Sequence, residues 1–361
     1  MSTPVPPLIV HAPPVQPIPL PLLITGISGV AGFNALPYFR ARHGSAVHAI
    51  RQADNWQLNG PGVVVCNAED RDTLERLFDQ YQFRSVLDTA GNCALKSCEL
   101  DPAMAWRINV EGVENLLAVM RGRDTRFVHL SIDLVYGGAS GVGGHVETDV
   151  PDPVTQYGAS MVAAEELIQA KMPTATTLRI SLPMGISFNG HAGAIDWIQS
   201  RFKKGKPATL YYDELRTPTF TDCLNELCET VLARDLSGLY HAGGGRRLSL
   251  YQIAQIVNRV GGYDPNLLHG CPRIDAGPMP PRAGDVTMDS SKLARALGYE
   301  PFDPWPLEDH WAPTHRDWHH ERPAGESGSA ALIEQILYRN QRRTIHHSPT
   351  TFYRRERMLQ H

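Results

Sequence analysis

Short apolar runs alternate with amphipathic stretches from residue 22 to about residue 190. Runs of four to eight apolar residues predict buried strands, and apolar positions three or four apart predict helices. The predicted strands are "PLLITG", "AVHAIR", "GVVVCN", "RSVLDTAG", "RFVHLSIDLVYG" and "TTLRISLPMG", and the main predicted helices are "VAGFNALPYFRARHG", "DRDTLERLFDQYQ", "AMAWRINVEGVENLLAVMRG" and "DPVTQYGASMVAAEELIQA". This alternation predicts an α/β fold, a Rossmann-type doubly wound parallel sheet with helices on both faces.

Changes in amino-acid composition and in the length of the predicted segments divide the chain into four parts. Residues 1–21 hold eight prolines and no Lys or Arg, which predicts an extended Pro-rich arm and not a signal peptide. Residues 22–190 form the predicted Rossmann domain. Residues 191–306 have shorter segments and predict a small lobe interleaved with the sheet. Residues 307–361 form a His- and Arg-rich extension, whose stretch "ALIEQILYRN" predicts a helix that docks on its own domain or on a second subunit.

Composition excludes several classes of function. The 34 basic and 38 acidic residues are nearly balanced, which argues against nucleic-acid or membrane-surface binding. No stretch of about 18 uninterrupted apolar residues predicts a membrane span. Six cysteines without a Cys-x-x-Cys pair predict reduced thiols in a cytoplasmic protein. The histidines of "HWAPTHRDWHHE" are interpreted as a surface segment, and no metal site is expected.

A glycine-rich turn follows the first predicted strand. Gly26, Gly29 and Gly32 let the backbone approach a pyrophosphate at the start of the next helix, which predicts dinucleotide binding. Arg51 ends the second strand, where an acidic residue usually meets a ribose without a 2′-phosphate. A guanidinium suits a 2′-phosphate, so NADP(H) is favoured over NAD(H). The other interpretation of Arg51 is an ordinary surface arginine.

The spacing of these glycines resembles that of the extended short-chain dehydrogenase/reductases. Four further stretches resemble the branch of dTDP-4-dehydrorhamnose reductase, which also includes the regulatory β subunit of methionine adenosyltransferase. They are "CELDPAMAWRINVEGVENLL", "HLSIDLVYGG", "DELRTPTFTDCL" and "PPRAGDVTMDSSKLARALGYEP". The resemblance covers roughly residues 22–306 and implies a nucleotide-linked sugar as the substrate.

The resemblance also implies roles for individual residues. It implies that Asn67, Ala68, Ala90 and Gly91 contact the cofactor, that Asn109 and Tyr157 belong to the active site, and that Arg216 and Arg282 contact the substrate. Tyr157 matches the family's catalytic tyrosine, with a leftover packing tyrosine as the alternative. For Arg282 the alternative is a loop arginine paired with Asp285.

Two positions depart from the family's pattern. The family's tyrosine is assisted by a lysine four residues later, on the same helical face, and by a Thr or Ser hydroxyl on the fifth strand. Here Met161 and Ile132 occupy those positions. Ser131 should point to the other side of the strand, and Lys171 lies more than three helical turns away. With no cation expected nearby, Tyr157 is predicted to be a weaker acid.

Two functions of different class therefore remain. The first is an oxidoreductase or epimerase that acts on a nucleotide-linked sugar through Tyr157 in an altered site. The second is a catalytically silent dinucleotide-binding protein, a regulatory or scaffold subunit with a partner protein or a second copy of itself. The resemblance of the substrate segments favours the first function, whereas Ile132 and Met161 favour the second.

Overall fold

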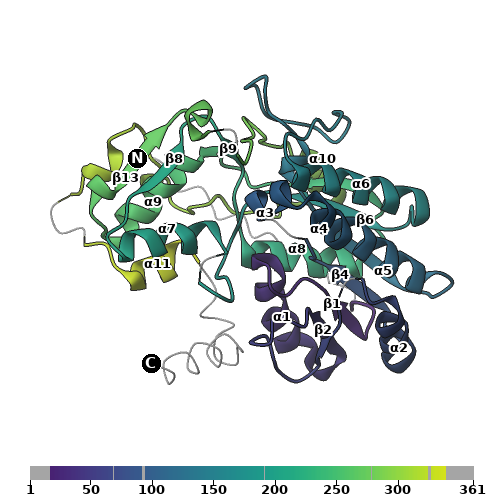
Figure 1. Ribbon diagram of the computed structural model, residues 1–361. Helices are drawn as coiled ribbons and strands as arrows, with labels where there is room; N and C mark the ends of the chain where they lie inside the picture. Colours follow the sequence, from purple (N-terminus) through teal and green to yellow (C-terminus); the bar gives the residue numbers. More distant parts are fainter. Residues whose placement is uncertain are drawn as a thin grey trace, which may run out of the picture.

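Seven parallel strands form the central sheet of the molecule (Figure 1). The structure, a computed structural model, describes residues 17–67, 69–91, 94–190, 192–277, 279–323 and 327–338. The strand order is β3-β2-β1-β4-β5-β6-β11. The bounds are β1 Leu22–Ile24, β2 Val47–Arg51, β3 Val63–Val65, β4 Ser85–Asp88, β5 Arg126–Ile132, β6 Thr176–Ile180 and β11 Gly238–Ala242. The predicted Rossmann-type sheet is confirmed, with strand order reversing beside β1 as in doubly wound folds.

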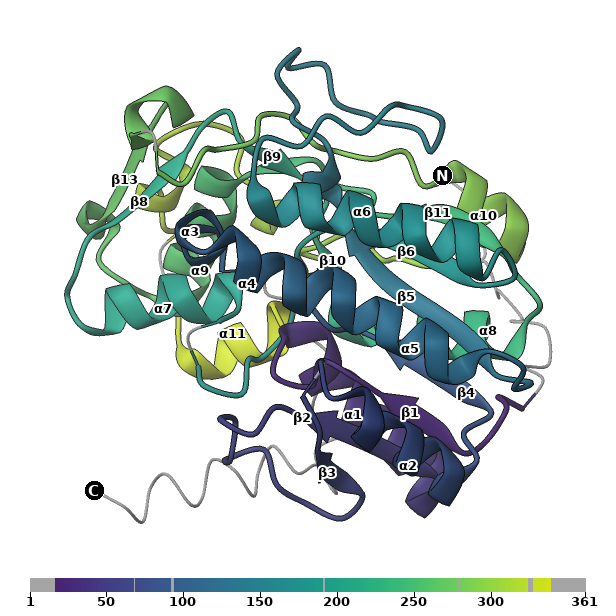
Figure 2. The ribbon, with the colours of Figure 1, turned by 45° about the vertical axis from the view of Figure 1, so that its right-hand side comes forward.

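Helices cover both faces of the sheet, because its strands are apolar on both sides (Figure 2). One face carries α2, α4, α5 and α6, and the other carries α1 and α8. Their bounds are α1 Val30–His43, α2 Arg71–Tyr81, α3 Leu95–Leu100, α4 Pro102–Trp106, α5 Gly112–Met120, α6 Gln156–Lys171 and α8 Thr221–Ala233. Between α4 and α5 the helix continues through a π-helical turn at Arg107–Glu111.

The sheet's last strand, β11, had no counterpart among the predicted strands. It comes from the part of the chain after residue 190 and pairs with β6. Its sequence "GLYHA" is short and is interrupted by a histidine, so it holds no apolar run. In the structure this His241 is buried in the core and bonded to the Tyr136 hydroxyl at 3.0 Å. A polar group whose hydrogen bonds are satisfied inside the core gives no strand signal in a hydrophobic pattern.

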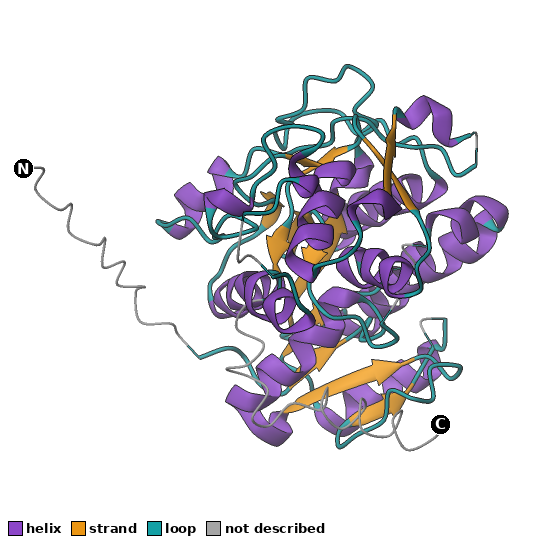
Figure 3. Cartoon of the chain, turned by 90° about the vertical axis from the view of Figure 1, so that its left-hand side faces the viewer, coloured by secondary structure: helices purple, strands orange, loops and turns teal. Residues whose placement is uncertain are grey.

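A smaller lobe stands beside the carboxyl ends of the strands (Figures 1 and 3). It combines short strand pairs with helices that pack against one another. Its elements are β7 Pro183–Met184, α7 Ala194–Lys203, β8 Ala208–Tyr211, β9 Leu215–Arg216, β10 Thr219–Phe220, β12 Leu248–Ser249, α9 Leu250–Gly261, β13 Leu268–Cys271 and α11 Ala330–Ile336. Helix α10, Ser291–Leu297, lies instead against β11 at the edge of the central sheet (Figure 2).

The two terminal extensions are described only in part. Residues 17–21 reach the sheet, where the Pro19 carbonyl accepts a hydrogen bond from the Ser85 hydroxyl at 2.5 Å. Helix α11 buries Ile333 against α9 of the same chain, which answers the question of where this helix docks. The rest of the predicted arm and tail, residues 1–16 and 339–361, lies outside the described residues.

The histidine-rich segment before α11 packs on the small lobe. His319 is buried beside the Gln255 amide, and burial lowers the pKa of its imidazole to about 4. His315 faces Glu321 at 3.2 Å. Among the described residues, no group of three or more His, Cys, Asp or Glu side chains is arranged to hold a metal ion. In the same part of the chain, no helix is both long enough and apolar enough to cross a membrane.

Candidate active site

A cavity of about 390 Å³ lies at the carboxyl ends of β1, β2 and β4. Gly26 and Gly29 line it, and Gly32 lies one helical turn further along α1. Gly26 has a φ of +66°, and a Cβ there would lie 2.4 Å from backbone atoms of Thr89 and Ala90. Strand β4 can therefore lie directly beside this turn only if residue 26 has no side chain. The cradle matches the backbone that a dinucleotide's pyrophosphate requires.

Three of the other residues predicted to contact the cofactor line the same cavity, whereas Asn67 does not. Arg51, Ala90 and Gly91 line it. The Arg51 guanidinium donates hydrogen bonds to the Gln52 carbonyl and the Asn59 side chain, each at 3.0 Å. Asn67 accepts a hydrogen bond from the backbone N–H of Ala53 at 2.9 Å, which fixes the loop after β2. Ala68 lies outside the described residues.

Cys66 also belongs to the wall of the first cavity, although the sequence analysis did not name it as a site residue. Its side chain lines the same cavity and is buried. Burial raises the pKa of its thiol to about 12, so the residue contributes an uncharged surface. The other described cysteines, Cys98, Cys223, Cys228 and Cys271, are also free thiols.

Tyr157 lines a second cavity of about 700 Å³, between the sheet and the small lobe. Both cavities are lined by Gly29, Ala90 and Gly91, so the two cavities adjoin each other. Thr155 caps the first turn of α6, accepting a hydrogen bond from the backbone N–H of Gly158 at 3.0 Å. A Cβ on Gly158 would lie 2.2 Å from the Leu134 carbonyl oxygen. This glycine lets the start of α6 lie against the end of β5, which brings Tyr157 to the cavity.

Gly91 is the point at which three predicted site residues meet. A Cβ built on it would lie 3.9 Å from the Tyr157 hydroxyl, the Met161 sulfur and the Asn109 side-chain oxygen. Asn109 belongs to the π-helical turn, and its amide donates a hydrogen bond to the Ser160 hydroxyl at 2.8 Å. Met161 is fully buried one turn after Tyr157. An apolar thioether therefore stands where the family has an ammonium group.

Ile132 ends β5 and lines the same cavity as Tyr157. The neighbouring hydroxyl of Ser131 is bonded to the Glu165 carboxylate, which also receives two nitrogen donors of Arg179. Lys171 lies at the far end of α6 and pairs with Glu114 at 2.5 Å. The Ser131 hydroxyl and the Lys171 ammonium group are thus both bonded to carboxylates of other helices or of α6.

A row of four alternating charges borders the cavity near Tyr157. Asp133, directly after β5, accepts two hydrogen bonds from Arg216 on β9. Glu214 lies 3.7 Å from the same guanidinium and accepts a hydrogen bond from Arg282 at 2.8 Å. Sequence reasoning named both arginines but neither carboxylate. It offered Asp285 as the alternative partner of Arg282, and this pairing is wrong, because Asp285 binds Arg247 instead.

Burial shapes the ionisation of this row. Burial raises the pKa of the Glu214 carboxyl, against the opposing charges of Arg282 and Arg216. It likewise raises the pKa of Asp133, although Arg216 opposes the change. Burial alone would lower the pKa of the Arg216 guanidinium, but Asp133, Glu214 and Tyr157 raise it further than burial lowers it. Arg216 is therefore a buried cation in the wall of the cavity that Tyr157 lines, where sequence analysis expected no cation close to the tyrosine.

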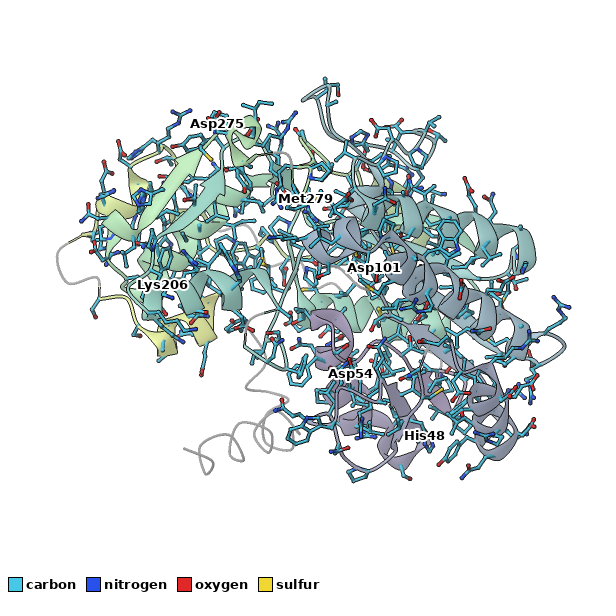
Figure 4. All side chains as sticks on the ribbon, in the orientation of Figure 1. His48, Asp54, Asp101, Lys206, Asp275 and Met279 are labelled. Atoms are coloured by element: carbon cyan, nitrogen blue, oxygen red, sulfur yellow. The ribbon has the colours of Figure 1, made fainter. Side chains whose placement is uncertain are left out.

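The second cavity is otherwise mostly apolar. Side chains of the sheet and of the small lobe form its walls; those from apolar residues include Leu130, Ile132, Leu134, Ile180, Leu182, Ile198, Leu210 and Ile253. Arg282 stacks over the ring of Tyr211 at 4.7 Å. In Figure 4, Asp54 marks the loop that lines the first cavity, and Met279 marks the loop that carries Pro280 and Arg282 to the second.

Known proteins resemble this chain along most of its length. The probable low-salt glycan biosynthesis reductase Agl14 of Haloferax volcanii is 24% identical over 277 residues, which cover 76% of this chain and 91% of that protein. The methionine adenosyltransferase 2 subunit beta of Danio rerio is 22% identical, covering 64% of this chain and 71% of that protein. Among solved structures, dTDP-4-dehydrorhamnose reductase of Bacillus anthracis in complex with NADP superposes with a TM-score of 0.67 at 18% identity, covering 79% of this chain and 95% of that one.

The family match is longer than any single motif. Residues 21–307 match the RmlD substrate binding domain family. This span includes both cavities, the glycine-rich turn and the row of charges. The chain therefore belongs to the RmlD substrate binding domain family, within the dTDP-4-dehydrorhamnose reductase-like branch of the extended short-chain dehydrogenase/reductases.

Proposed function

We propose that the protein is a nicotinamide-dependent reductase or epimerase that acts on the carbonyl group of a nucleotide-linked sugar through Tyr157. One observation carries the proposal: the Tyr157 phenol borders a large cavity that joins the dinucleotide cavity at Gly91. A silent subunit needs no substrate cavity next to its cofactor. The solved and curated relatives named above include reductases of such sugars.

The reaction needs a hydride and a proton at one carbonyl group. A bound reduced nicotinamide supplies the hydride, which forms the new C–H bond at the carbonyl carbon. As the C=O bond opens, its electron pair moves to oxygen, which takes the proton of the Tyr157 hydroxyl. The phenolate then recovers a proton from water. The apolar walls around Ile132 keep other water away from the reacting carbon.

Arg282 and Arg216 are the proposed contacts for the substrate's diphosphate and sugar. Both line the cavity, and the Tyr211 ring beneath Arg282 holds its guanidinium plane toward the opening. Planar guanidinium groups bind phosphate oxygens in pairs. The Arg282 guanidinium donates a hydrogen bond to Glu214 in this structure, so a diphosphate must compete with that carboxylate for the guanidinium.

NADP(H) is the proposed cofactor, because Arg51 lies where a 2′-phosphate would bind. We expect Arg51→Glu to weaken NADPH binding about 10–100-fold, since a charge-assisted pair becomes a repulsion, and to change NADH binding less than about threefold. Fluorescence titration with each cofactor measures both constants. Arg84→Glu makes the same change of charge at the amino end of β4, outside the residues that line the two cavities, and serves as the control. An equal loss for NADH and NADPH would mean that Arg51 only holds its loop.

The second candidate is a catalytically silent regulatory subunit, which the buried Met161 favours. The relative from Danio rerio is by name the beta subunit of methionine adenosyltransferase 2. Such a subunit would act with a partner protein or as a homodimer.

One assay separates the two candidates. Purified protein is mixed with NADPH, binding is followed by fluorescence, and consumption is followed by absorbance after adding 4-keto nucleotide sugars. A reductase consumes the cofactor in proportion to the sugar added. Binding of NADPH without consumption across the panel of sugars rejects the proposed reaction and leaves the regulatory role.

A further inference from the structure

Four charged side chains line the same cavity as Tyr157, and a fifth lies behind one of them. Glu214, Arg216, Arg282 and Lys96 line it, and Asp133 lies directly behind Arg216. Lys96 is exposed on α3, and Arg282 donates a hydrogen bond to Glu214. Arg216 is the only buried cation in this set, since its side chain is 4% exposed. Charges act more strongly where water is excluded.

The hydrogen bonds of Arg216 fix the direction of its guanidinium. Nε donates to one Asp133 oxygen at 2.7 Å, and Nη2 donates to the other. Nη1 is 3.7 Å from Glu214, which is beyond hydrogen-bond distance. Within the described part of the chain, Nη1 makes no hydrogen bond. One edge of the guanidinium is thus held by Asp133, and its remaining N–H groups stay available to an oxygen in the cavity.

We propose that Arg216 supplies the positive charge beside Tyr157 that Met161 cannot supply, and that its Nη1 group donates to the oxygen that Tyr157 protonates. The inference deepens the proposed function and depends on it for its catalytic meaning. In this proposal a fixed guanidinium on the small lobe replaces two groups of the family's pattern. These are the lysine on the helix that corresponds to α6 and the hydroxyl on the strand that corresponds to β5. The substitutions Ile132 and Met161 then leave the site altered but not silent.

The charge acts on the proton transfer. When Tyr157 gives its proton to the carbonyl oxygen, a phenolate forms inside an apolar wall. The Arg216 guanidinium favours this phenolate, and Nη1 holds the oxygen while the C–H bond forms. Asp133 reduces the net charge of the pair but also prevents the guanidinium from turning away. Glu214 is divided between two arginines, so it offsets less of the charge of Arg216.

Titration of the phenol tests the proposal without turnover. Protein labelled with ¹³C at the Cζ carbon of tyrosine is followed by NMR from neutral to alkaline pH, and Tyr157→Phe identifies the Tyr157 signal. We expect Arg216→Gln to move the titration midpoint of this signal upward by at least about one pH unit. Arg216→Lys, which keeps the charge, should leave most of the wild-type midpoint.

Removal of Arg216 alone leaves Asp133 buried and unpaired, which can prevent folding. The double variant Asp133→Asn/Arg216→Gln removes both charges and keeps amide hydrogen bonds in their place. This variant leaves no unpaired buried charge, so it should fold, and it should still show the upward shift, because the cation that lines the cavity of Tyr157 is gone. Adding Met161→Lys to Arg216→Gln should bring the midpoint back down, since the family's own cation is restored.

Two results would overturn the proposal. One is an unchanged titration midpoint of Tyr157 in both Arg216→Gln and Asp133→Asn/Arg216→Gln. The other is a shift produced by Lys96→Gln and not by Arg216→Gln, which would assign the charge to α3. The titration uses no cofactor or sugar, so its outcome is separate from that of the reductase assay. An upward shift in a protein that consumes no NADPH would support the charge of Arg216 and reject the proposed reaction.

Discussion

Replacing Tyr157 with Phe is expected to lower kcat for carbonyl reduction by about 10²–10⁴-fold, the range for loss of a general acid. The phenol is buried, borders the substrate cavity and meets Asn109 and Met161 around Gly91. Phe keeps the ring and its packing and removes only the hydroxyl. NADPH binding should therefore stay within about threefold of the wild type.

Steady-state rates and fluorescence titrations on the same preparations measure this effect. Tyr81→Phe is the matched control, because Tyr81 ends α2 and packs against His48, away from both cavities. A Tyr157→Phe protein with wild-type kcat would show that some other group delivers the proton. An equal loss in the Tyr81 variant would point to general damage to the fold.

Gly26→Ala should weaken NADPH binding by at least about 100-fold, which corresponds to roughly 2.7 kcal/mol. A methyl group at this position would lie 2.4 Å from backbone atoms of β4's end, so the turn or the strand must move. The positive φ adds roughly 1–2 kcal/mol of strain for any L side chain. Both costs fall on the turn that faces the pyrophosphate.

Gly141→Ala separates strain from lost binding. Gly141 has a φ of +71°, close to that of Gly26, but a Cβ there meets no atom within 4 Å. Both variants should lose stability from backbone strain in thermal melts, Gly26→Ala more because of its backbone clash, while only Gly26→Ala loses NADPH in fluorescence titrations. Normal NADPH affinity in Gly26→Ala would mean that the cofactor does not rest on this turn.

The sheet could be predicted from the sequence because its first six strands lie in short segments rich in apolar residues that alternate with amphipathic stretches. Leu22–Ile24 and Ser85–Asp88, for example, are buried along their whole length, as parallel strands between two helical layers must be. The glycine-rich turn was also predictable, because φ above zero and close backbone contact both select glycine. β11 was missed, since its buried His241 breaks the pattern.

The candidate site was harder to predict, because its contacts join distant parts of the chain. Asp133 and Arg216 are 83 residues apart, and Arg282 and Glu214 are 68 apart. Nothing in the local sequence around Arg282 favours Glu214 over the nearer Asp285. The π-helical turn that presents Asn109 was likewise hidden, because one extra residue per turn hardly changes a helix's apolar period. The sequence therefore predicted the missing lysine and named Arg216 as a substrate contact, but it did not predict that Asp133 holds this arginine in the wall of the Tyr157 cavity.

The central claim is that this altered site still reduces a carbonyl group. The most direct measurement uses NADPH deuterated at the transferable position, together with a 4-keto nucleotide sugar, and follows deuterium in the sugar by mass spectrometry. We predict that wild-type protein transfers one deuterium to each product molecule and that Tyr157→Phe transfers it far more slowly. Tight binding of NADPH with no deuterium in any sugar of the panel would contradict the account.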